Sequence, residues 1–331
     1  MSGGFLFVIG QPGAASYFLP LWRAWLAQPP AWPWHIFADP SVASALAANG
    51  IGGECVTSDG TDAEGITALV ARLRPSALVT STSFRFVEGI ALQIASERRT
   101  RCVQLIDSHY DYALRLRATN GGGAAPPHLI LVLDRVAELE AVGEGLPAER
   151  LRVAGNPAWE HVPAAPPGDP KRAAFVSQPV QFDYGDRLGY SERTALALVA
   201  RAMERPDCMF DELRLAAHPR EQWQEQDLPR GCTIGPSGDA AVAEASTVFG
   251  MFSSLLVQSF LAGRRTIYVL PETATADLCG LGRHGYLPRA STSAEVSAAT
   301  AAPIDATKVS EVRSWYADSR RRVEDVLLSV L

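Results

Sequence analysis

Short apolar runs alternate with amphipathic stretches of helical period along the 331-residue chain. Runs such as Phe5–Ile9, Ala77–Thr80 and Cys102–Ile106 have the length and composition of buried strands, whereas Tyr17–Ala27 and Phe86–Arg98 repeat apolar residues at helical spacing. Strands that alternate with helices in this way are typical of a parallel sheet covered by helices on both faces. The pattern therefore predicts an α/β fold.

The alternation is interrupted between residues 161 and 171, where prolines and Gly168 gather as they do in linkers. We therefore expect two Rossmann-like domains facing each other across a cleft, an N-terminal domain over residues 1–160 and a C-terminal domain over 172–309. Residues 310–331 read as one long helix, which we expect to pack back on the N-terminal domain. The Ala/Gly/Pro segment 121–127 is predicted to be a loop.

Charge and cysteine content exclude several classes of protein. The net charge is -6, and the longest basic run is Arg320–Arg322, which is too short to indicate a nucleic-acid partner. The five cysteines are widely spaced, so neither a disulfide framework nor a metal site is predicted. The first residues lead directly into an apolar strand, and no apolar stretch has the length of a membrane span, so we expect a cytoplasmic protein.

The first candidate for chemistry is the pair His218-Pro219, which follows a predicted strand over Glu212–Ala216. The proline turns the chain out of the sheet and holds the imidazole at the strand's carboxyl end. A histidine placed there can donate to a phosphate oxygen. The alternative is a histidine that only caps backbone groups.

The second candidate is Ser253-Ser254, between a predicted strand over Thr247–Gly250 and a predicted helix over Leu255–Ala262. A helix N-terminus attracts anions through its free N–H groups and its dipole, although serines there can also serve as caps alone. We expect His218 and the two serines to lie on successive strand ends around one anion. Ser177 and Gln178, after a predicted strand over Ala173–Val176, are candidates for contacts with the base, ribose or phosphate of a nucleotide, or are plain loop residues.

The N-terminal half contains two further polar groups at strand ends. Gly10 and Gln11 begin a weak glycine-containing loop, to which we assign a role toward an acceptor rather than toward phosphate. Asp107, His109 and Asp111 follow the predicted strand Cys102–Ile106. A carboxylate there could accept a hydroxyl proton, with Asp107 as first choice and Asp111 as second, unless Asp107 only caps a helix. His109 is placed on the acceptor side. A further polar patch, Ser81–Ser83, follows the strand Ala77–Thr80.

The strings Phe175-Val176-Ser177-Gln178-Pro179 and His218-Pro219-Arg220-Glu221, together with the serine pair and the two-domain pattern, resemble bacterial glycosyltransferases of the GT-B fold. They are most similar to the sialyltransferase, polysialyltransferase and Kdo-transferase branches. The resemblance implies inverting transfer of a nonulosonic acid or Kdo-like sugar from a CMP-activated donor to a glycan or protein acceptor, without a metal or other cofactor.

Under this resemblance His218, Pro219, Ser253 and Ser254 hold the CMP phosphate, His218 also serves catalysis, and Asp107 or Asp111 is the base. The acidic-acidic-Gly motif that often accompanies the base in those families is missing. Peripheral contact with a membrane is left open, and no pattern indicates an oligomeric state.

Three alternatives keep the fold and change the function. The turn Gly155-Asn156-Pro157 resembles UDP-GlcNAc 2-epimerases, which make a UDP-sugar epimerase or a UDP-sugar transferase the first alternative. The epimerases usually have Ser-Gly-Gly where this chain has two serines, and the serines favour a single phosphate. A nucleotide-sugar-binding protein without catalysis is the second alternative, and a CDP-alcohol phosphotransferase is the third.

Overall fold

The computed structural model describes residues 1–331 except 1–2, 53–54, 58–62, 83–85, 121–125 and 237. The chain divides into two compact units, of which the first comprises Met1–His161 together with Trp315–Leu331 and the second comprises Val162–Ser314. Most of the predicted loop 121–127 and the end of the polar patch Ser81–Ser83 lie outside the described residues.

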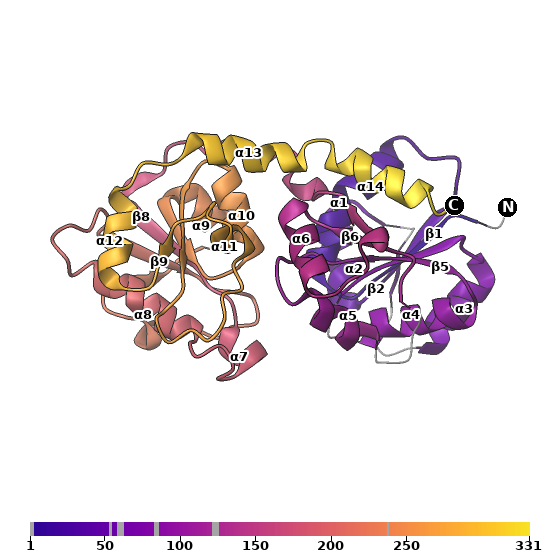
Figure 1. Cartoon of the computed structure of the whole chain (residues 1–331), viewed down its shortest axis with the longest axis horizontal. Coiled ribbons are helices and arrows are strands. Elements are labelled where there is room, and N and C mark those ends of the chain that lie inside the picture. The colour runs from indigo at the N-terminus through magenta and orange to yellow at the C-terminus, as the bar shows by residue number, and fades with distance from the viewer. Residues whose placement is uncertain (1–2, 53–54, 58–62, 83–85, 121–125, 237) are drawn as a thin grey trace. The chain divides into compact units, whose positions relative to one another are not determined.

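Strands and helices alternate through both units, as the hydrophobic pattern predicts (Figure 1). In the first unit the order is β1 (Phe5–Ile9), α1 (Pro12–Ala27), β2 (Trp34–Ala38), α2 (Pro40–Ala48), β3 (Cys55–Thr57), α3 (Ala63–Leu73), β4 (Ala77–Ser81), α4 (Phe86–Glu97), β5 (Arg101–Leu105), α5 (Tyr112–Asn120), β6 (Leu129–Val132), α6 (Arg135–Gly143), η1 (Ala148–Arg150), β7 (Leu151–Val153) and η2 (Pro157–Trp159). The chain then enters the second unit with β8 (Asp169–Val176), α7 (Val180–Tyr184), α8 (Glu192–Ala202), β9 (Glu212–Ala216), η3 (Glu225–Asp227), β10 (Cys232–Ile234), α9 (Gly238–Glu244), β11 (Ala245–Gly250), α10 (Ser254–Leu261), β12 (Arg265–Val269), α11 (Gly280–Arg283), β13 (Arg289–Ala290) and α12 (Ser293–Ala301). Helix α13 (Ala306–Tyr316) leads out of this unit, and α14 (Ser319–Leu328) belongs to the first unit again.

Each unit is built on one parallel sheet. In the first unit the described strands follow the order β3-β2-β1-β4-β5-β6-β7, and in the second the order is β10-β9-β8-β11-β12-β13. All the strand pairs are parallel, and in both sheets the earliest strand of the unit lies in the interior of the sheet. This is the doubly wound arrangement in which ligands bind at the carboxyl ends of the strands. The predicted α/β fold with two Rossmann-like domains is confirmed.

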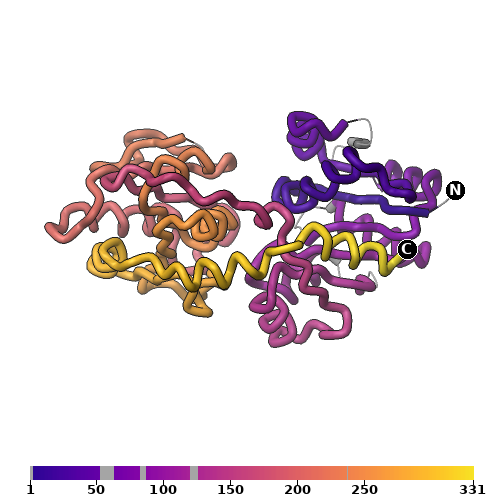
Figure 2. Tube along the Cα trace, turned by 90° about the horizontal axis from the view of Figure 1, so that it is seen from above, coloured from indigo at the N-terminus to yellow at the C-terminus, as the bar shows by residue number. Residues whose placement is uncertain are grey.

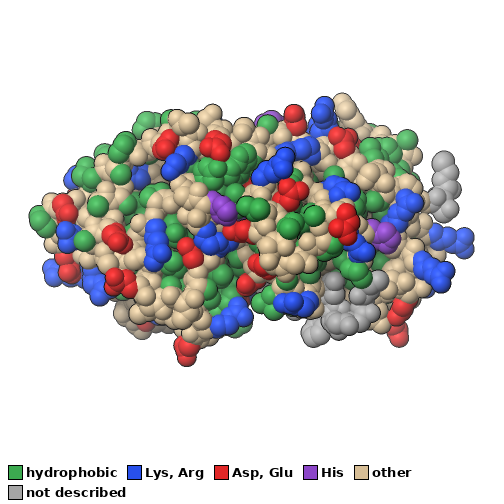
Figure 3. All heavy atoms as spheres, viewed as in Figure 1, with side chains coloured by type: hydrophobic (Ala, Val, Ile, Leu, Met, Phe, Trp, Pro, Cys, Tyr) green, Lys and Arg blue, Asp and Glu red, His purple; other side chains and the backbone are tan. Residues whose placement is uncertain are grey.

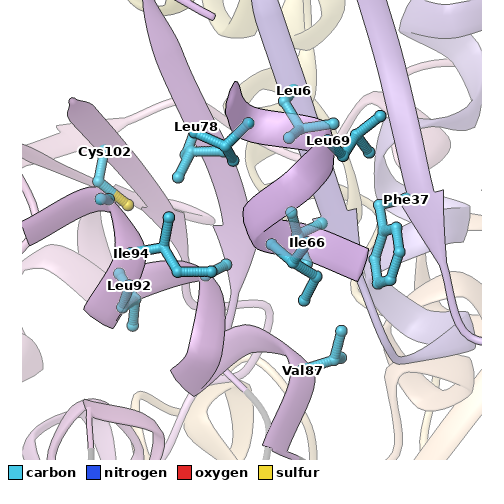
Figure 4. Close-up of a cluster of buried hydrophobic side chains, with 13 residues drawn as sticks. Leu6, Phe37, Ile66, Leu69, Leu78, Val87, Leu92, Ile94 and Cys102 are labelled. Atoms are coloured by element: carbon cyan, nitrogen blue, oxygen red, sulfur yellow. The ribbon is translucent and has the colours of Figure 1, made fainter. Parts of the chain in front are cut away.

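The core of the first unit explains why its strands read as continuous apolar runs. Strand β1 is buried along its whole length because helices cover the sheet on both sides. On one side, Leu6 and Leu78 from the sheet pack with Ile66 of α3 and Leu92 of α4 (Figure 4). On the other side α1 supplies an aromatic cluster, in which Trp22 meets Phe7 edge to face at 5.3 Å.

The end of the chain differs from the single long helix predicted over 310–331. Two helices are present, α13 and α14, and Asp318 between them adopts a left-handed backbone conformation with φ 55°. The hydrophobic period continues across this break, so periodicity alone does not reveal it. Helix α14, the yellow end of the chain in Figure 2, belongs to the first unit. There the Trp25 indole N–H donates to Glu324 at 2.7 Å. The expected packing of the terminal helix on the first domain is confirmed.

The predicted linker also differs in extent from the structure. The boundary between the units lies at His161, but residues 169–171 already belong to β8. Pro170 is the second residue of β8, and proline is tolerated near the start of a strand although it cannot donate to the ladder.

Candidate functional site

Three strand ends come together at the carboxyl edge of the second sheet. Strand β8 pairs with β9 on one side and β11 on the other, with Val176 opposite both Ala216 and Gly250. The residues that follow these three positions therefore begin at the same level of the sheet. His218 and Ser253 were expected on successive strands, but β8 lies between their strands, which puts Ser177 and Gln178 in the middle.

His218 is held in a tight turn. Its carbonyl accepts the N–H of Glu221 at 2.9 Å, with Pro219 at the second position of the turn, where proline's fixed φ is favourable. The Nδ1 atom of His218 accepts the N–H of Arg220 at 3.1 Å, so in the neutral imidazole the proton lies on Nε2. Partial burial, assisted by the Arg220 charge, lowers the pKa of His218. Nε2 is thus a donor carried by a neutral ring.

Glu221 connects the residues at this edge of the sheet, a role that was not predicted from the sequence. One carboxylate oxygen accepts the Ser177 hydroxyl at 2.7 Å, and the other accepts the N–H of His218 at 2.7 Å. Burial raises the pKa of Glu221, while these two donors oppose the rise. The signal in the sequence was its position three residues after the histidine, which closes a turn.

Ser177 and Gln178 are both bonded to protein groups. The Ser177 hydroxyl is taken by Glu221, and the side-chain oxygen of Gln178 accepts the N–H of Phe252 at 2.9 Å. These bonds connect the end of β8 to the turn after β9 and to the loop before α10. Both residues therefore help to hold the turn that carries His218 and the loop that carries the serines.

The two serines occupy different positions at the start of α10. Ser253 is the N-cap, and its hydroxyl accepts the N–H of Leu255 at 3.2 Å. Ser254 is the first residue of the helix, and its side chain is exposed. An anion at this terminus would meet the helix dipole and the Ser254 hydroxyl.

In the first unit, Gly10 and Gln11 lie between β1 and α1. The helix begins at Pro12, earlier than the predicted Tyr17, because a proline's missing N–H costs nothing in the first helical turn. The N–H of Gly10 donates to the fully buried carboxylate of Glu88 at 2.7 Å. A Cβ on Gly10 would lie 2.5 Å from Val87, so only glycine fits. Glu88 was not identified from the sequence.

Asp107 follows β5 at the carboxyl edge of the first sheet. It is half-buried, and its Oδ2 lies 3.1 Å from where a Cβ on Gly13 would stand, beside the first turn of α1. Burial raises the pKa of Asp107, and the charge of Arg115 opposes the rise. The alternative that Asp107 caps a helix is not supported, because α5 begins only at Tyr112. A carboxylate with a raised pKa is suited to accept a proton.

His109 and Asp111 are placed differently from Asp107. His109 is buried, and its Nε2 lies 2.6 Å from Asp134 Oδ2. Although burial raises it, the pKa of Asp134 is held low by His109 and by the donors Ala137 N–H and Tyr316 hydroxyl. Asp111 has a left-handed backbone with φ 56°, and its carbonyl accepts from Arg115 at the start of α5. His109 therefore faces Asp134 in the interior, and Asp111 shapes the start of a helix.

Among the described residues, no group of three or more His, Cys, Asp or Glu side chains could hold a metal ion. No helix formed by the described residues is long and apolar enough to cross a membrane. On the face drawn in Figure 3, basic and acidic side chains are interspersed, so no broad basic surface appears among the residues drawn in colour.

Known proteins resemble this chain in structure rather than in sequence. No family model matches the sequence, and no curated protein matches it. A UDP-N-acetylglucosamine 2-epimerase from Neisseria meningitidis bound to UDP-GlcNAc has a TM-score of 0.66 and 9% identity, covering 98% of this chain and 100% of the other. A putative UDP-N-acetylglucosamine 2-epimerase from Listeria monocytogenes has a TM-score of 0.66 and 12% identity, and the match covers 97% of this chain and 95% of the other.

The glycosyltransferase SnogD from Streptomyces nogalater has a TM-score of 0.59 and 16% identity, and the match covers 99% of this chain and 100% of the other. At such identities the likeness establishes the fold alone. The chain has the two-domain α/β fold of GT-B type that these enzymes share.

Proposed function

We propose that this protein is a UDP-sugar-dependent glycosyltransferase. The observation that carries the proposal is that His218 and the serines Ser253 and Ser254, at the N-terminus of α10, follow strands on either side of β8. Bonds of Ser177 and Gln178 connect both to the end of β8. A neutral imidazole donor, a serine hydroxyl and a helix N-terminus suit a phosphate group. This is the carboxyl edge at which doubly wound sheets bind ligands.

UDP is the nucleotide that the structural comparisons favour. Two of the similar enzymes are named for UDP-N-acetylglucosamine, and one of these was solved with it bound. The CMP donor implied by the sequence motifs has no counterpart among these proteins. The serine pair is compatible with either nucleotide, because its hydroxyls and the helix start can contact one phosphate of a diphosphate as well as a lone phosphate.

Among the candidate reactions, sugar transfer fits the side chains of the first unit best. Sugar transfer to a hydroxyl needs one general base, which takes the proton as the acceptor oxygen attacks. Asp107 supplies a half-buried carboxylate with a raised pKa at a strand end. In this mechanism the helix start and His218 Nε2 stabilise the charge that develops on the departing phosphate.

The second candidate is 2-epimerisation of a UDP-sugar. It is favoured by the higher TM-scores of the epimerases, 0.66 against 0.59 for the transferase. This reaction removes a proton from carbon and returns one to the opposite face, so it needs acid and base groups on both sides of the sugar. Asp107 could be one of them.

One experiment separates these possibilities. Thermal shift and calorimetry with UDP, UDP-GlcNAc, CMP and a CMP-sialic acid identify the nucleotide, and UDP ligands are expected to bind at least tenfold more tightly. Product analysis with UDP-GlcNAc then looks for released UDP in the presence of glycan acceptors, and for the 2-epimer without them. Preferential binding of CMP ligands would contradict the proposed donor, and epimer formation without UDP release would replace transfer by epimerisation.

A further inference from the structure

A cavity of about 310 Å³ lies in the second unit beside the turn that carries His218. Its walls come from the start of α7 (Figure 1), from the start of α8 and from the residues that follow the turn. Pockets for small ligands begin at roughly 300 Å³, so this cavity fits one ring and not a whole nucleotide sugar. The proposed function assigns nothing to it.

Aromatic rings form one part of the lining. Phe182 is 78% exposed, although burial of such a side chain contributes about 1.5–3 kcal/mol of stability. Trp223 is half-buried, and the Arg193 guanidinium lies 4.3 Å from its ring centroid. The Arg220 guanidinium lies 5.7 Å from the centroid of the Phe182 ring, but most of the ring remains exposed and can contact the apolar face of a ligand.

Carboxylates form another part of the lining. Glu192 is 9% exposed, and one of its oxygens accepts the N–H of Gln181 at 2.9 Å. Glu221 shares this wall, and the charge of Glu192 adds to the burial that raises the pKa of Glu221. Each Glu221 oxygen already accepts one hydrogen bond and keeps a second lone pair, so the two carboxylates still favour a ligand that donates hydrogen bonds.

The arginines of the cavity are already paired with acids. Arg220 makes two bonds of 2.7 Å to the carboxylate of Asp183, and Arg193 lies 3.4 Å from Asp227. Their charges are therefore largely balanced before any ligand enters, and the cavity does not suit an anion. A donor-rich, uncharged ligand with an apolar face fits the lining best.

We propose that this cavity binds a single pyranose ring, with the C–H face of the sugar on Phe182 and its hydroxyls donating to Glu192 and Glu221. Sugars combine an apolar face with several hydroxyl donors, which matches an exposed aromatic ring beside two carboxylates. The ring can belong to an acceptor glycan or to the donor sugar, and the inference does not depend on the proposed reaction.

The test is saturation-transfer NMR on the full chain with methyl β-galactoside, methyl β-N-acetylglucosaminide, methyl α-mannoside and methyl α-sialoside. At least one neutral glycoside is expected to bind. Phe182→Ala should weaken that binding at least tenfold, whereas Met209→Ala, which alters another exposed apolar side chain of the same unit, should leave it unchanged. Trp223→Phe, which keeps an aromatic ring, should weaken it less than Phe182→Ala.

Titration of UDP and UDP-GlcNAc separates this inference from the proposed function. If Phe182→Ala weakens the binding of UDP-GlcNAc but not that of UDP, the bound ring is the donor sugar. If it weakens only the binding of the free glycoside, the ring belongs to an acceptor. Equal weakening of UDP itself would overturn the inference, because the cavity would then hold the base. If none of the four glycosides binds, the inference is overturned even when UDP still binds. If only UDP fails to bind, the result counts against the proposed function alone.

Discussion

The Ser177 hydroxyl donates to the carboxylate of Glu221 at 2.7 Å, across 44 residues of sequence. The second oxygen of that carboxylate accepts the N–H of His218. One side chain thus joins the end of β8 to the turn after β9, and it sets the position of the imidazole that we assign to phosphate binding.

Replacement of this carboxylate should weaken nucleotide binding without unfolding the protein. Glu221→Gln keeps one acceptor oxygen and turns the other position into a donor that faces an N–H or O–H group. We expect about tenfold weaker binding of UDP, equivalent to roughly 1.4 kcal/mol. Calorimetry measures this, with the exposed Glu225→Gln as the control. Wild-type affinity in Glu221→Gln would show that the turn is held by other bonds.

Loss of the imidazole should have a direct effect on phosphate binding. A hydrogen bond to a charged group contributes about 1.5–3 kcal/mol, so His218→Ala is expected to weaken UDP binding about 10- to 100-fold. His218→Asn retains a side-chain donor and should recover part of the loss. Unchanged affinity in a folded His218→Ala variant would remove His218 from the site.

The pKa of His218 also predicts how binding changes with pH. Its pKa in the free protein is below the ordinary 6.5, and a bound phosphate raises it. The complex therefore binds more protons than the free protein, so affinity should rise as the pH falls from 7.5 toward 5.5. UDP-GlcNAc is the ligand to use because its diphosphate has no ionisation in this range. The slope should vanish in His218→Asn.

Asp107→Asn is expected to separate activity from stability. Folding raises the pKa of Asp107 above the ordinary 3.8, which means that the ionised carboxylate destabilises the folded state relative to the unfolded state. At pH 7 the substitution should leave the melting temperature unchanged or higher. Turnover should fall about 100- to 10,000-fold, as for loss of a general base, while UDP binding persists. Full turnover in Asp107→Asn would place the base elsewhere, and Asp111→Asn is then the next variant to assay.

The Asp134 carboxylate should be critical for stability. It lies opposite His109, caps α6 and accepts the Tyr316 hydroxyl at 2.7 Å, so Asp134→Ala leaves several buried donors without an acceptor. We expect a loss of about 3–5 kcal/mol in the free energy of unfolding, against about 1 kcal/mol for Tyr316→Phe. Folding lowers the pKa of Asp134, so its carboxylate stabilises the folded state at pH values above the ordinary pKa of 3.8. This stabilisation is lost as the pH falls through the lowered pKa. Urea unfolding at pH 7 and pH 3 measures both effects, and equal losses in the two variants at pH 7 would contradict this role.

Local chemistry in the sequence determined the alternation of strands and helices and the type of turn at His218. Apolar runs of strand length, a proline after the histidine and a serine before an amphipathic helix act over a few residues, so a linear pattern records them. For the same reason the positions of His218, Ser253 and Asp107 after their strands were predictable.

Tertiary structure decided which of these strand ends meet. The order β9-β8-β11 puts Ser177 and Gln178 between His218 and Ser253, and no period in the chain encodes that order. Bonded partners can lie far apart in the sequence. Gly10 and Glu88 are separated by 78 residues, and Asp134 and Tyr316 by 182. Their pairing depends on how sheets and helices pack and on the cost of burying a carboxylate without donors, both of which are properties of the folded chain.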